Sequence, residues 1–407
     1  MNKASPSIPW TISLSAFLIV FAMWSPLYVI SPLESIIREH LAISYTQLSL
    51  LYGAPMIMVA VLALPGGLLA DRIGPKRAAG IGAIIIAVGT LLRGLADTAT
   101  ELLVFNFIYG VGFGLAFPSI PKLISAWTPP SQTGRTSGLF NFALPLGSAL
   151  VVTLTLPVVY PATGSVSGTF LVWGIPPLAA AISWWLLVKE PPGLKRELID
   201  VSHARLRSLI AEVIRNRNVW CLFSLLFLNE FFMNTMMGWS PALLQLKGAS
   251  PEMAGVIASI IPWAAIPGML LMPRLSDRLG LRRPFIWGPS LVLAITALVA
   301  IQADLAQSWV VMALVGISIP TRFITILTML VELVPREHVG TASGLVFVGY
   351  LGGAIGPFTA GNILDLTGSF DRAFLVLVAA SVAALIIAFR LPETGRRVIK
   401  REILTAT

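Results

Sequence analysis

The sequence predicts an all-α membrane protein in which twelve transmembrane helices form two similar six-helix bundles. Of the 407 residues, 56% are hydrophobic and only 12% are charged. So few charged residues could not cover the surface of a soluble domain. Twelve apolar stretches of about 20 residues are each long enough to cross a bilayer. An internal duplication, described below, divides these stretches into two sets of six.

The expected spans follow one another with short connections. In the first half they cover residues 10–33, 46–69, 77–97, 101–125, 136–158 and 168–188. In the second half they cover residues 219–242, 251–272, 284–304, 309–333, 340–364 and 372–391. We therefore expect four parts: an N-terminal bundle at 1–188, a linker at 189–218, a C-terminal bundle at 219–391 and a tail at 392–407.

A short charged turn between two apolar stretches occurs twice, at residues 67–77 and 273–283. Both copies contain Asp-Arg followed two residues later by Gly, and Asp277 lies 206 residues after Asp71. The same offset relates glycine and serine residues further along each half, including Gly147 and Gly353. Separate matches at one offset indicate that the two halves are repeats of one structural unit.

The basic residues predict the orientation of the chain in the membrane. With an even number of spans, both termini lie on one side, and 23 of the 28 Lys and Arg residues fall on that side. Only Arg38, Lys247 and Arg372 fall on the other. By the positive-inside rule, we expect both termini in the cytoplasm and the protein in the inner membrane. In the linker, apolar residues at helical spacing predict an amphipathic helix on the inner membrane surface, with a solvated linker as the alternative.

Twelve spans in two halves, with Asp-Arg-x-Gly turns after spans 2 and 8, resemble the major facilitator superfamily of secondary transporters. Gly89-Thr90-Leu91-Leu92-Arg93 in span 3 is also similar to the cyanate-permease-like and nitrate-porter-like branches. The resemblance implies alternating access, with substrate bound between the halves near spans 1, 4, 7 and 10. Asn106 replaces the family's span-4 arginine, and Leu144 replaces the glycine before Pro145, which disfavours drug–proton antiport.

The repeated Asp-Arg pairs are candidate gating residues: Asp71, Arg72, Asp277 and Arg278. A helix start favours an anion, so Asp71 could sit at the start of span 11 and Asp277 at the start of span 5. Such contacts would tie the halves together on the cytoplasmic side and break when that side opens. The alternative is a plain positive-inside turn, which explains the arginines but not the repeated aspartates.

Glu230 in span 7 and Arg322 in span 10 are expected near the middle of the membrane, where a charge costs roughly 2.5–3.5 kcal/mol. Arg322 could bind an anion through its guanidinium. Glu230 could pair with Arg322 in the empty site and take a proton when the anion binds. The alternative is a permanent structural ion pair. Arg93, near Asp97, is expected to reach the outer interface.

Further polar and aromatic residues are candidates to contact the substrate. They are Tyr28, Tyr109, Asn141, Asn234, Trp263 and Tyr350, with Asn106, Asn229 and Thr325 as weaker candidates. The small number of charges favours a substrate with one negative charge.

The sequence thus predicts a secondary active transporter for a small anion, with protons as coupling ions and the lipid bilayer as its environment. The alternatives are an exporter of hydrophobic drug-like or cationic compounds, and a transporter-like sensor. We expect a monomer with no enzymatic activity, no cofactor and no nucleic-acid partner. The single cysteine, Cys221, and three unclustered histidines predict no metal site.

Overall fold

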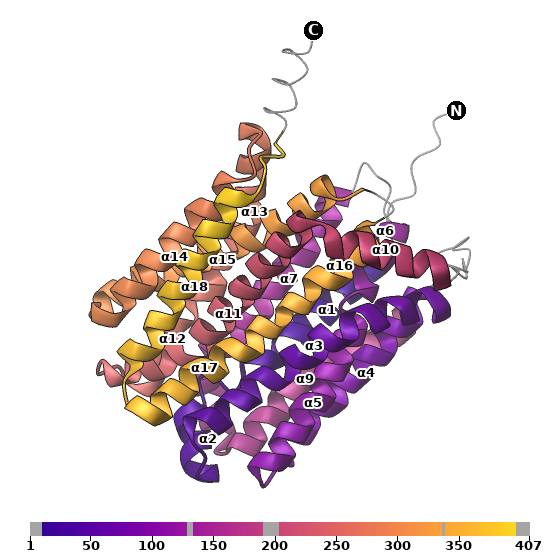
Figure 1. The fold of residues 1–407 in the computed structure, drawn as a ribbon. Helices are drawn as coiled ribbons and strands as arrows, with labels where there is room; N and C mark the ends of the chain where they lie inside the picture. The colour runs from indigo at the N-terminus through magenta and orange to yellow at the C-terminus, as the bar shows by residue number, and fades with distance from the viewer. Residues whose placement is uncertain (1–9, 128–132, 190–202, 336–337, 396–407) are drawn as a thin grey trace. The chain divides into compact units, whose positions relative to one another are not determined.

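The computed structural model describes residues 10–127, 133–189, 203–335 and 338–395 (Figure 1). Over these residues the regular elements are all helical, and twelve helical segments are long and apolar enough to cross a membrane. The expected fold class is therefore confirmed. Residues 190–202 of the expected linker and residues 396–407 of the expected tail lie outside the described residues.

The chain divides into two compact units. Unit 1 comprises Met1–Ile43 and Ala54–Asp200, and unit 2 comprises Ser44–Gly53 and Val201–Thr407. One boundary therefore falls inside a single helix, α3 (Tyr45–Ile73), whose first turns belong to unit 2. The sequence placed this whole helix in the N-terminal bundle.

Unit 1 contains, besides the greater part of α3, the helices of the first half of the chain. They are α1 (Trp10–Trp24), η1 (Pro26–Tyr28), α2 (Glu34–Leu41), α4 (Pro75–Arg93), α5 (Ala99–Ala116), α6 (Ser119–Trp127), α7 (Thr133–Leu154), η2 (Thr155–Val159), α8 (Tyr160–Thr163) and α9 (Val166–Leu187). The first expected span reached residue 33, but α1 ends at Trp24. Pro26 begins a short 3₁₀ turn there, because proline is suited to a first helical position.

The close packing of α4 against α5 positions one of the charged residues of unit 1. A Cβ atom on Gly89 would lie 2.5 Å from the backbone nitrogen of Tyr109, so only glycine permits this approach. The start of α5 is fixed by a capping box, in which Thr98 and Glu101 each bind the other's backbone N–H. Tyr109 is thereby held against the last turn of α4, which carries Arg93.

Unit 2 contains the helices of the second half. They are α10 (His203–Arg215), α11 (Arg217–Leu246), α12 (Pro251–Ala258), α13 (Ile260–Leu279), α14 (Pro284–Gln302), α15 (Leu305–Leu333), α16 (Val339–Phe347), η3 (Val348–Leu351), α17 (Gly352–Thr367) and α18 (Phe370–Arg390). Helix α11 packs against α15, α17 and α18, and α15 packs against α13 and α14. A Cβ atom on Gly352 would lie 2.0 Å from the carbonyl oxygen of Phe227, so glycine brings α17 close to α11.

Helix α10 forms within the expected linker and lies beside α16 (Figure 1). Nε2 of His338, the residue before α16, lies 2.9 Å from a carboxylate oxygen of Glu212 on α10. Val213 is buried, whereas Ile210 and Ile214 are exposed. The exposed isoleucines suit a helix that rests on an apolar surface outside the protein.

Candidate substrate and coupling site

The two charged residues expected at mid-membrane depth belong to one buried polar cluster in unit 2. Glu230 lies on α11 and Arg322 on α15. Glu230 is 5% exposed and Arg322 is 0% exposed. The two helices pack directly against each other, so both side chains enter the same interior space.

Asn229 lies between these two side chains. Its Oδ1 accepts a hydrogen bond of 2.9 Å from Nε of Arg322, and its Nδ2 donates to Oε1 of Glu230 at 3.3 Å. Within the described part of the chain, no salt bridge joins Glu230 to Arg322 directly. The expected direct ion pair is therefore replaced by an amide bridge, because the carboxylate of Glu230 turns toward Asn234, one helical turn further on α11.

The guanidinium of Arg322 is held by neutral acceptors from two helices. Besides Asn229, it donates to the carbonyl oxygen of Leu228 at 3.3 Å and to Oγ of Ser290 on α14 at 3.4 Å. Ser290 is not among the residues expected from the sequence, because a single hydroxyl in an apolar helix is a weak signal. In this arrangement Arg322 has no exposed surface.

The remaining candidates of unit 2 differ in exposure. Trp263 on α13 is 39% exposed, whereas Tyr350 in η3 is buried. Asn234 is buried, and its Nδ2 donates to both the backbone carbonyl and the carboxylate of Glu230. The hydroxyl of Thr325 donates to the carbonyl of Thr321 on its own helix, a common way for a hydroxyl to be satisfied within a span.

The candidates of unit 1 are mostly occupied by contacts within the protein. Tyr28 is buried in η1, and Asn141 on α7 is half-buried. Nδ2 of Asn106 donates to the carbonyl of Leu102 on its own helix. The hydroxyl of Tyr109 donates to the carbonyl of Met23 in α1.

Arg93 does not reach the interface, contrary to the expectation. It is 1% exposed, and its Nη1 donates to the carbonyl oxygen of Pro26 at 2.7 Å. Its guanidinium carbon lies 4.2 Å from the ring centre of Tyr109, a cation–π contact. Because α1 ends at Trp24, the carbonyl of Pro26 can accept this hydrogen bond from Arg93. Because Gly89 lets α5 approach α4 closely, the ring of Tyr109 lies against the guanidinium.

The two repeated aspartates have partners within their own units. In unit 1, Asp71 forms an ion pair of 2.6 Å with Lys122, whose Nζ also donates to the carbonyl of Gly67. In unit 2, Asp277 forms an ion pair of 2.6 Å with Arg282. Arg72 and Arg278 are exposed.

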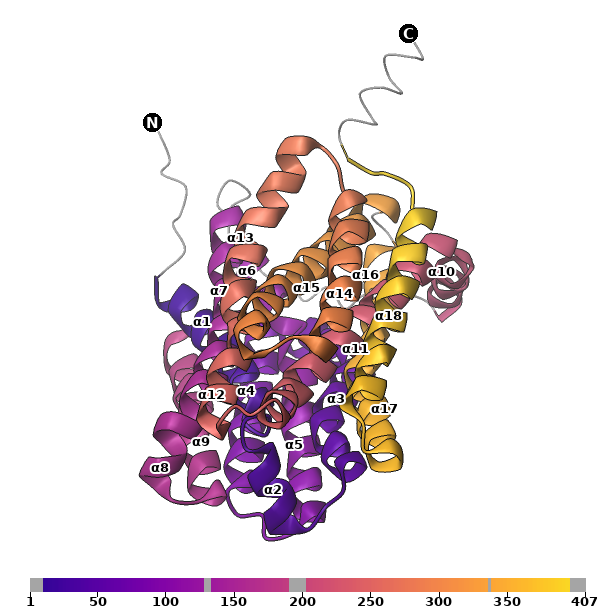
Figure 2. The same ribbon diagram turned by 90° about the vertical axis from the view of Figure 1, so that its left-hand side faces the viewer.

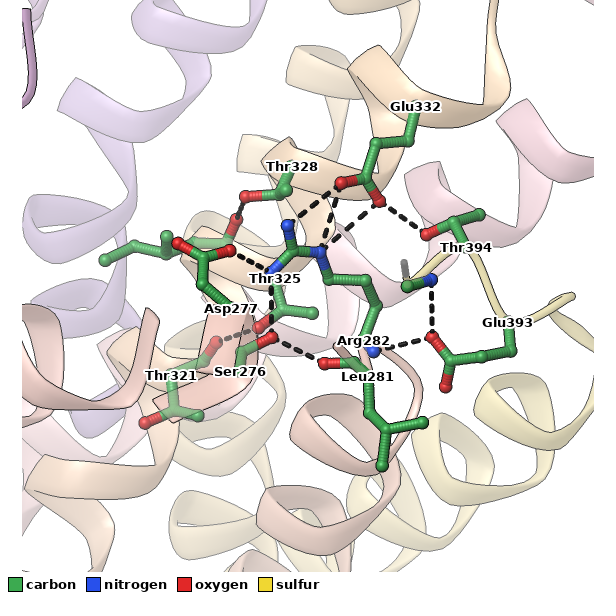
Figure 3. Close-up of polar contacts among 12 residues, drawn as sticks. Ser276, Asp277, Leu281, Arg282, Thr321, Thr325, Thr328, Glu332, Glu393 and Thr394 are labelled. Atoms are coloured by element: carbon green, nitrogen blue, oxygen red, sulfur yellow. Dashed lines mark hydrogen bonds and ion pairs between the residues drawn. The ribbon is translucent and has the colours of Figure 1, made fainter. Parts of the chain in front are cut away.

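Arg282 is the centre of a polar cluster where α13, α15 and the segment after α18 meet (Figure 3). Its Nη2 lies 3.0 Å from Oε1 of Glu332, so Glu332 balances a basic residue of the charged turn. Thr394 donates to the same carboxylate, and Glu393 accepts from the backbone N–H of Arg282. Burial opposes the charge, but Glu332 and Asp277 outweigh it and raise the pKa of Arg282.

The start of α3 is held in unit 2 by a carboxylate that the sequence analysis did not identify. Asp365 on α17 accepts hydrogen bonds from the backbone N–H groups of Tyr45 at 3.0 Å and Thr46 at 2.8 Å. The hydroxyl of Ser49 donates to the carbonyl of Pro357 at 2.9 Å. Asp365 therefore caps α3 from another helix, far away in the sequence.

Twelve helices that can cross a membrane, with buried charged residues among them, are typical of a multi-pass membrane transporter. The model of the Major Facilitator Superfamily matches residues 12–357 and 246–404. The chain belongs to this family of secondary transporters.

Individual relatives are distant. The probable sulfoacetate transporter SauU of Cupriavidus necator is 25% identical over 85% of this chain and 85% of its own length. The cyanate transport protein CynX of Escherichia coli is 26% identical over 61% of this chain and 62% of its own length. The crystal structure of a D-xylose–proton symporter has a TM-score of 0.78 at 19% identity, covering 95% of this chain and 99% of that one, and shows the shared fold.

Proposed function

We propose that this transporter moves a small organic or inorganic anion with one negative charge across the inner membrane, coupled to protons, by alternating access. The observation that carries the proposal is the buried cluster of Arg322, Asn229 and Glu230. Relatives named for sulfoacetate and cyanate support an anionic substrate, and cyanate carries the single charge proposed here.

Charge balance in this cluster links proton and anion. With Glu230 ionised, its negative charge compensates the guanidinium of Arg322 through the amide of Asn229. When Glu230 takes a proton, a permanent positive charge remains in a low-dielectric interior, where an unpaired charge is costly. An anion then restores neutrality. Proton uptake therefore favours anion binding, which is the requirement for symport.

The anion approaches the cluster from the side of Glu230 and Asn234, which keep 5% and 4% exposure. Among the described residues, three of the five N–H groups of Arg322 have acceptors, so an anion can accept from the other two or replace one of these contacts. The longest of these contacts, 3.4 Å to Ser290, is the one that a carboxylate oxygen replaces most easily. We place the other candidates, Tyr28, Tyr109, Asn141, Trp263 and Tyr350, around the transport path.

Gating is assigned to the charged turns on the side of the termini, which we place in the cytoplasm. In each turn the aspartate, Asp71 or Asp277, has a basic partner in its own unit. We propose that these pairs rearrange when the cytoplasmic side opens, with the exposed Arg72 and Arg278 at the lipid surface. The amphipathic α10 lies on the inner membrane surface in this arrangement.

The test is binding followed by transport, with purified protein. Thermal-shift measurements with lactate, cyanate, nitrate and tetraphenylphosphonium identify the ligand class. The best ligand is then followed into proteoliposomes under an imposed pH gradient. We expect an anion to bind and to accumulate on the alkaline side.

Two variants separate the roles of the charged residues. Arg322→Gln should weaken anion binding about tenfold or more, since a charge-assisted hydrogen bond is lost, and Arg322→Lys controls for folding. Glu230→Gln should still bind the anion, without the pH gradient driving accumulation, whereas the control Glu252→Gln, at an exposed carboxylate, behaves as wild type. Stabilisation by the cation alone, or equal anion binding in Arg322→Gln, would overturn the proposal.

A further inference from the structure

A cavity of about 310 Å³ lies in unit 1 and shares no residue with the cluster proposed for transport. Its wall comes from α2, the end of α4, α5, α8 and the start of α9, and includes Arg93, Ile37, Ser167 and Phe170. Figure 2 shows α2 and α8 at the same end of unit 1. In the proposed orientation this is the outer end.

Arg93 is one of the residues around this cavity, and the hydrogen-bonding groups of its guanidinium are only partly used. Nη1 is held by the carbonyl of Pro26, and the plane of the group is held by the ring of Tyr109. Nε and Nη2 are buried and have no hydrogen-bond partner among the described residues. These two nitrogens form one edge of the guanidinium, with N–H bonds that point in parallel. That edge matches the two oxygens of a carboxylate.

The charge of Arg93 is also uncompensated. Within the described residues, no aspartate or glutamate forms a salt bridge with it, although it is 1% exposed. A buried cation without a partner anion is strongly unfavourable, and buried hydrogen-bond donors normally find acceptors. A ligand anion would meet both requirements at once.

The start of α9 adds a second favourable feature for an anion. The 22-residue helix begins at Val166, and the side chain of Ser165 accepts from the N–H of Gly168 at 3.0 Å. Val166 and Ser167, whose N–H groups have no earlier turn to bind, also line the cavity. The positive end of the helix dipole therefore faces the same space as Arg93.

We propose that this cavity is a second anion site, which binds a small carboxylate with a short hydrocarbon or aromatic body through Nε and Nη2 of Arg93. The cavity lies at the lower end of the size range of ligand pockets, which limits the ligand to a few carbon atoms or one ring. Ile37 and Phe170 supply an apolar surface for the body. The site contains neither Arg322 nor Glu230, so it stands whether or not the transported solute is an anion.

The first experiment measures binding of propionate and benzoate to the full-length protein in lipid nanodiscs by calorimetry, with propionamide and benzamide as neutral controls. We expect the carboxylates to bind and the amides not to bind. Arg93→Lys keeps the charge but loses the two parallel N–H donors, so the affinity for the carboxylates should fall about tenfold or more. Arg38→Gln, at the partly exposed arginine of α2, should leave this binding unchanged.

The second experiment does not alter Arg93, so it holds even if the buried variant fails to fold. Ser167→Cys places a thiol on the exposed rim of the cavity, and Cys221→Ser removes the native thiol. Benzoate should slow alkylation of this thiol by maleimide several-fold, and benzamide should not. Equal protection by the amide, or protection by benzoate that is undiminished when Arg93→Lys is added, would overturn the proposal.

Discussion

Oδ1 of Asn229 lies 2.9 Å from Nε of Arg322, and the other end of the same amide donates to Glu230. The neutral side chain of Asn229 therefore connects Glu230 with Arg322. Asn229→Leu removes both hydrogen bonds while keeping the volume similar. We expect a loss of about 1–3 kcal/mol in the free energy of unfolding, because a buried charged donor is left without its acceptor.

The measurement for Asn229→Leu is thermal unfolding in nanodiscs, with Asn106→Leu as the matched control. Asn106 is equally buried, but it donates to the carbonyl of its own helix. The control should lose less stability. If both variants unfold at the same temperature, the amide bridge contributes nothing specific.

The stability of unit 1 should depend on pH through Glu34. This residue of α2 is 2% exposed, and burial raises the pKa of its carboxyl above the ordinary 4.5, with Arg38 opposing the shift. A raised pKa means that the folded protein favours the protonated acid. The stabilisation is therefore complete below pH 4.5 and is lost as the pH rises through the pKa of the folded state.

Glu34→Gln should therefore raise the unfolding temperature at pH 7.5 and flatten its dependence on pH between 4.5 and 7.5. Melting curves over this range measure the effect. Glu39→Gln, at an exposed carboxylate of the same helix, should reproduce the wild-type curve. A wild-type curve that rises toward pH 7.5, with Glu34→Gln falling below it, would contradict the sign of the effect.

Arg282 rather than Arg278 should support the charged turn of unit 2. Its guanidinium contacts Asp277, Ser276 and Glu332 together, which a lysine ammonium cannot do in the same geometry. Arg282→Lys should cost about 1–2 kcal/mol of stability, whereas Arg278→Lys, at an exposed arginine, should stay within about 0.5 kcal/mol of wild type. Chemical denaturation measures the free energy of unfolding of both variants. A larger loss in Arg278→Lys than in Arg282→Lys would refute the assignment.

Asp365→Ala should release the start of α3. The loss of a helix cap costs about 1 kcal/mol, which corresponds to roughly fivefold faster amide hydrogen exchange where the opening is local. Mass spectrometry of the peptide that contains Tyr45 and Thr46 measures this rate. Asp371→Ala, at an exposed acid of the next helix, should leave that peptide unchanged. Unchanged exchange in Asp365→Ala would show that α3 is held by its apolar contacts alone.

Features with a local cause could be predicted from the sequence. Hydropathy and length locate the twelve spans, because each span must satisfy its own backbone in lipid. Counting residues from the span ends placed Glu230 and Arg322 at similar depths, and the structure brings them into one cluster. The amphipathic spacing in the linker predicted a helix where α10 forms.

Features that depend on distant partners could not be predicted in this way. Counting placed Arg93 at a span end, but its burial is decided by the carbonyl of Pro26 and the ring of Tyr109. Neither is near it in sequence. Ser290 and Asp365 likewise became meaningful only when folding placed an arginine or a helix start beside them.

Helix α3 contains a proline close to the boundary between the two units. The boundary between the units falls after Gly53, and Pro55 follows two residues later inside the same helix. Pro55 has no backbone N–H to donate to the carbonyl of Leu51, so one main-chain hydrogen bond of the helix is missing here. The first turns are held by Asp365 in unit 2, and this missing bond separates them from the remaining length of the helix. One continuous helix thus contributes its first turns to unit 2 and the rest of its length to unit 1, and proline stands next to the boundary.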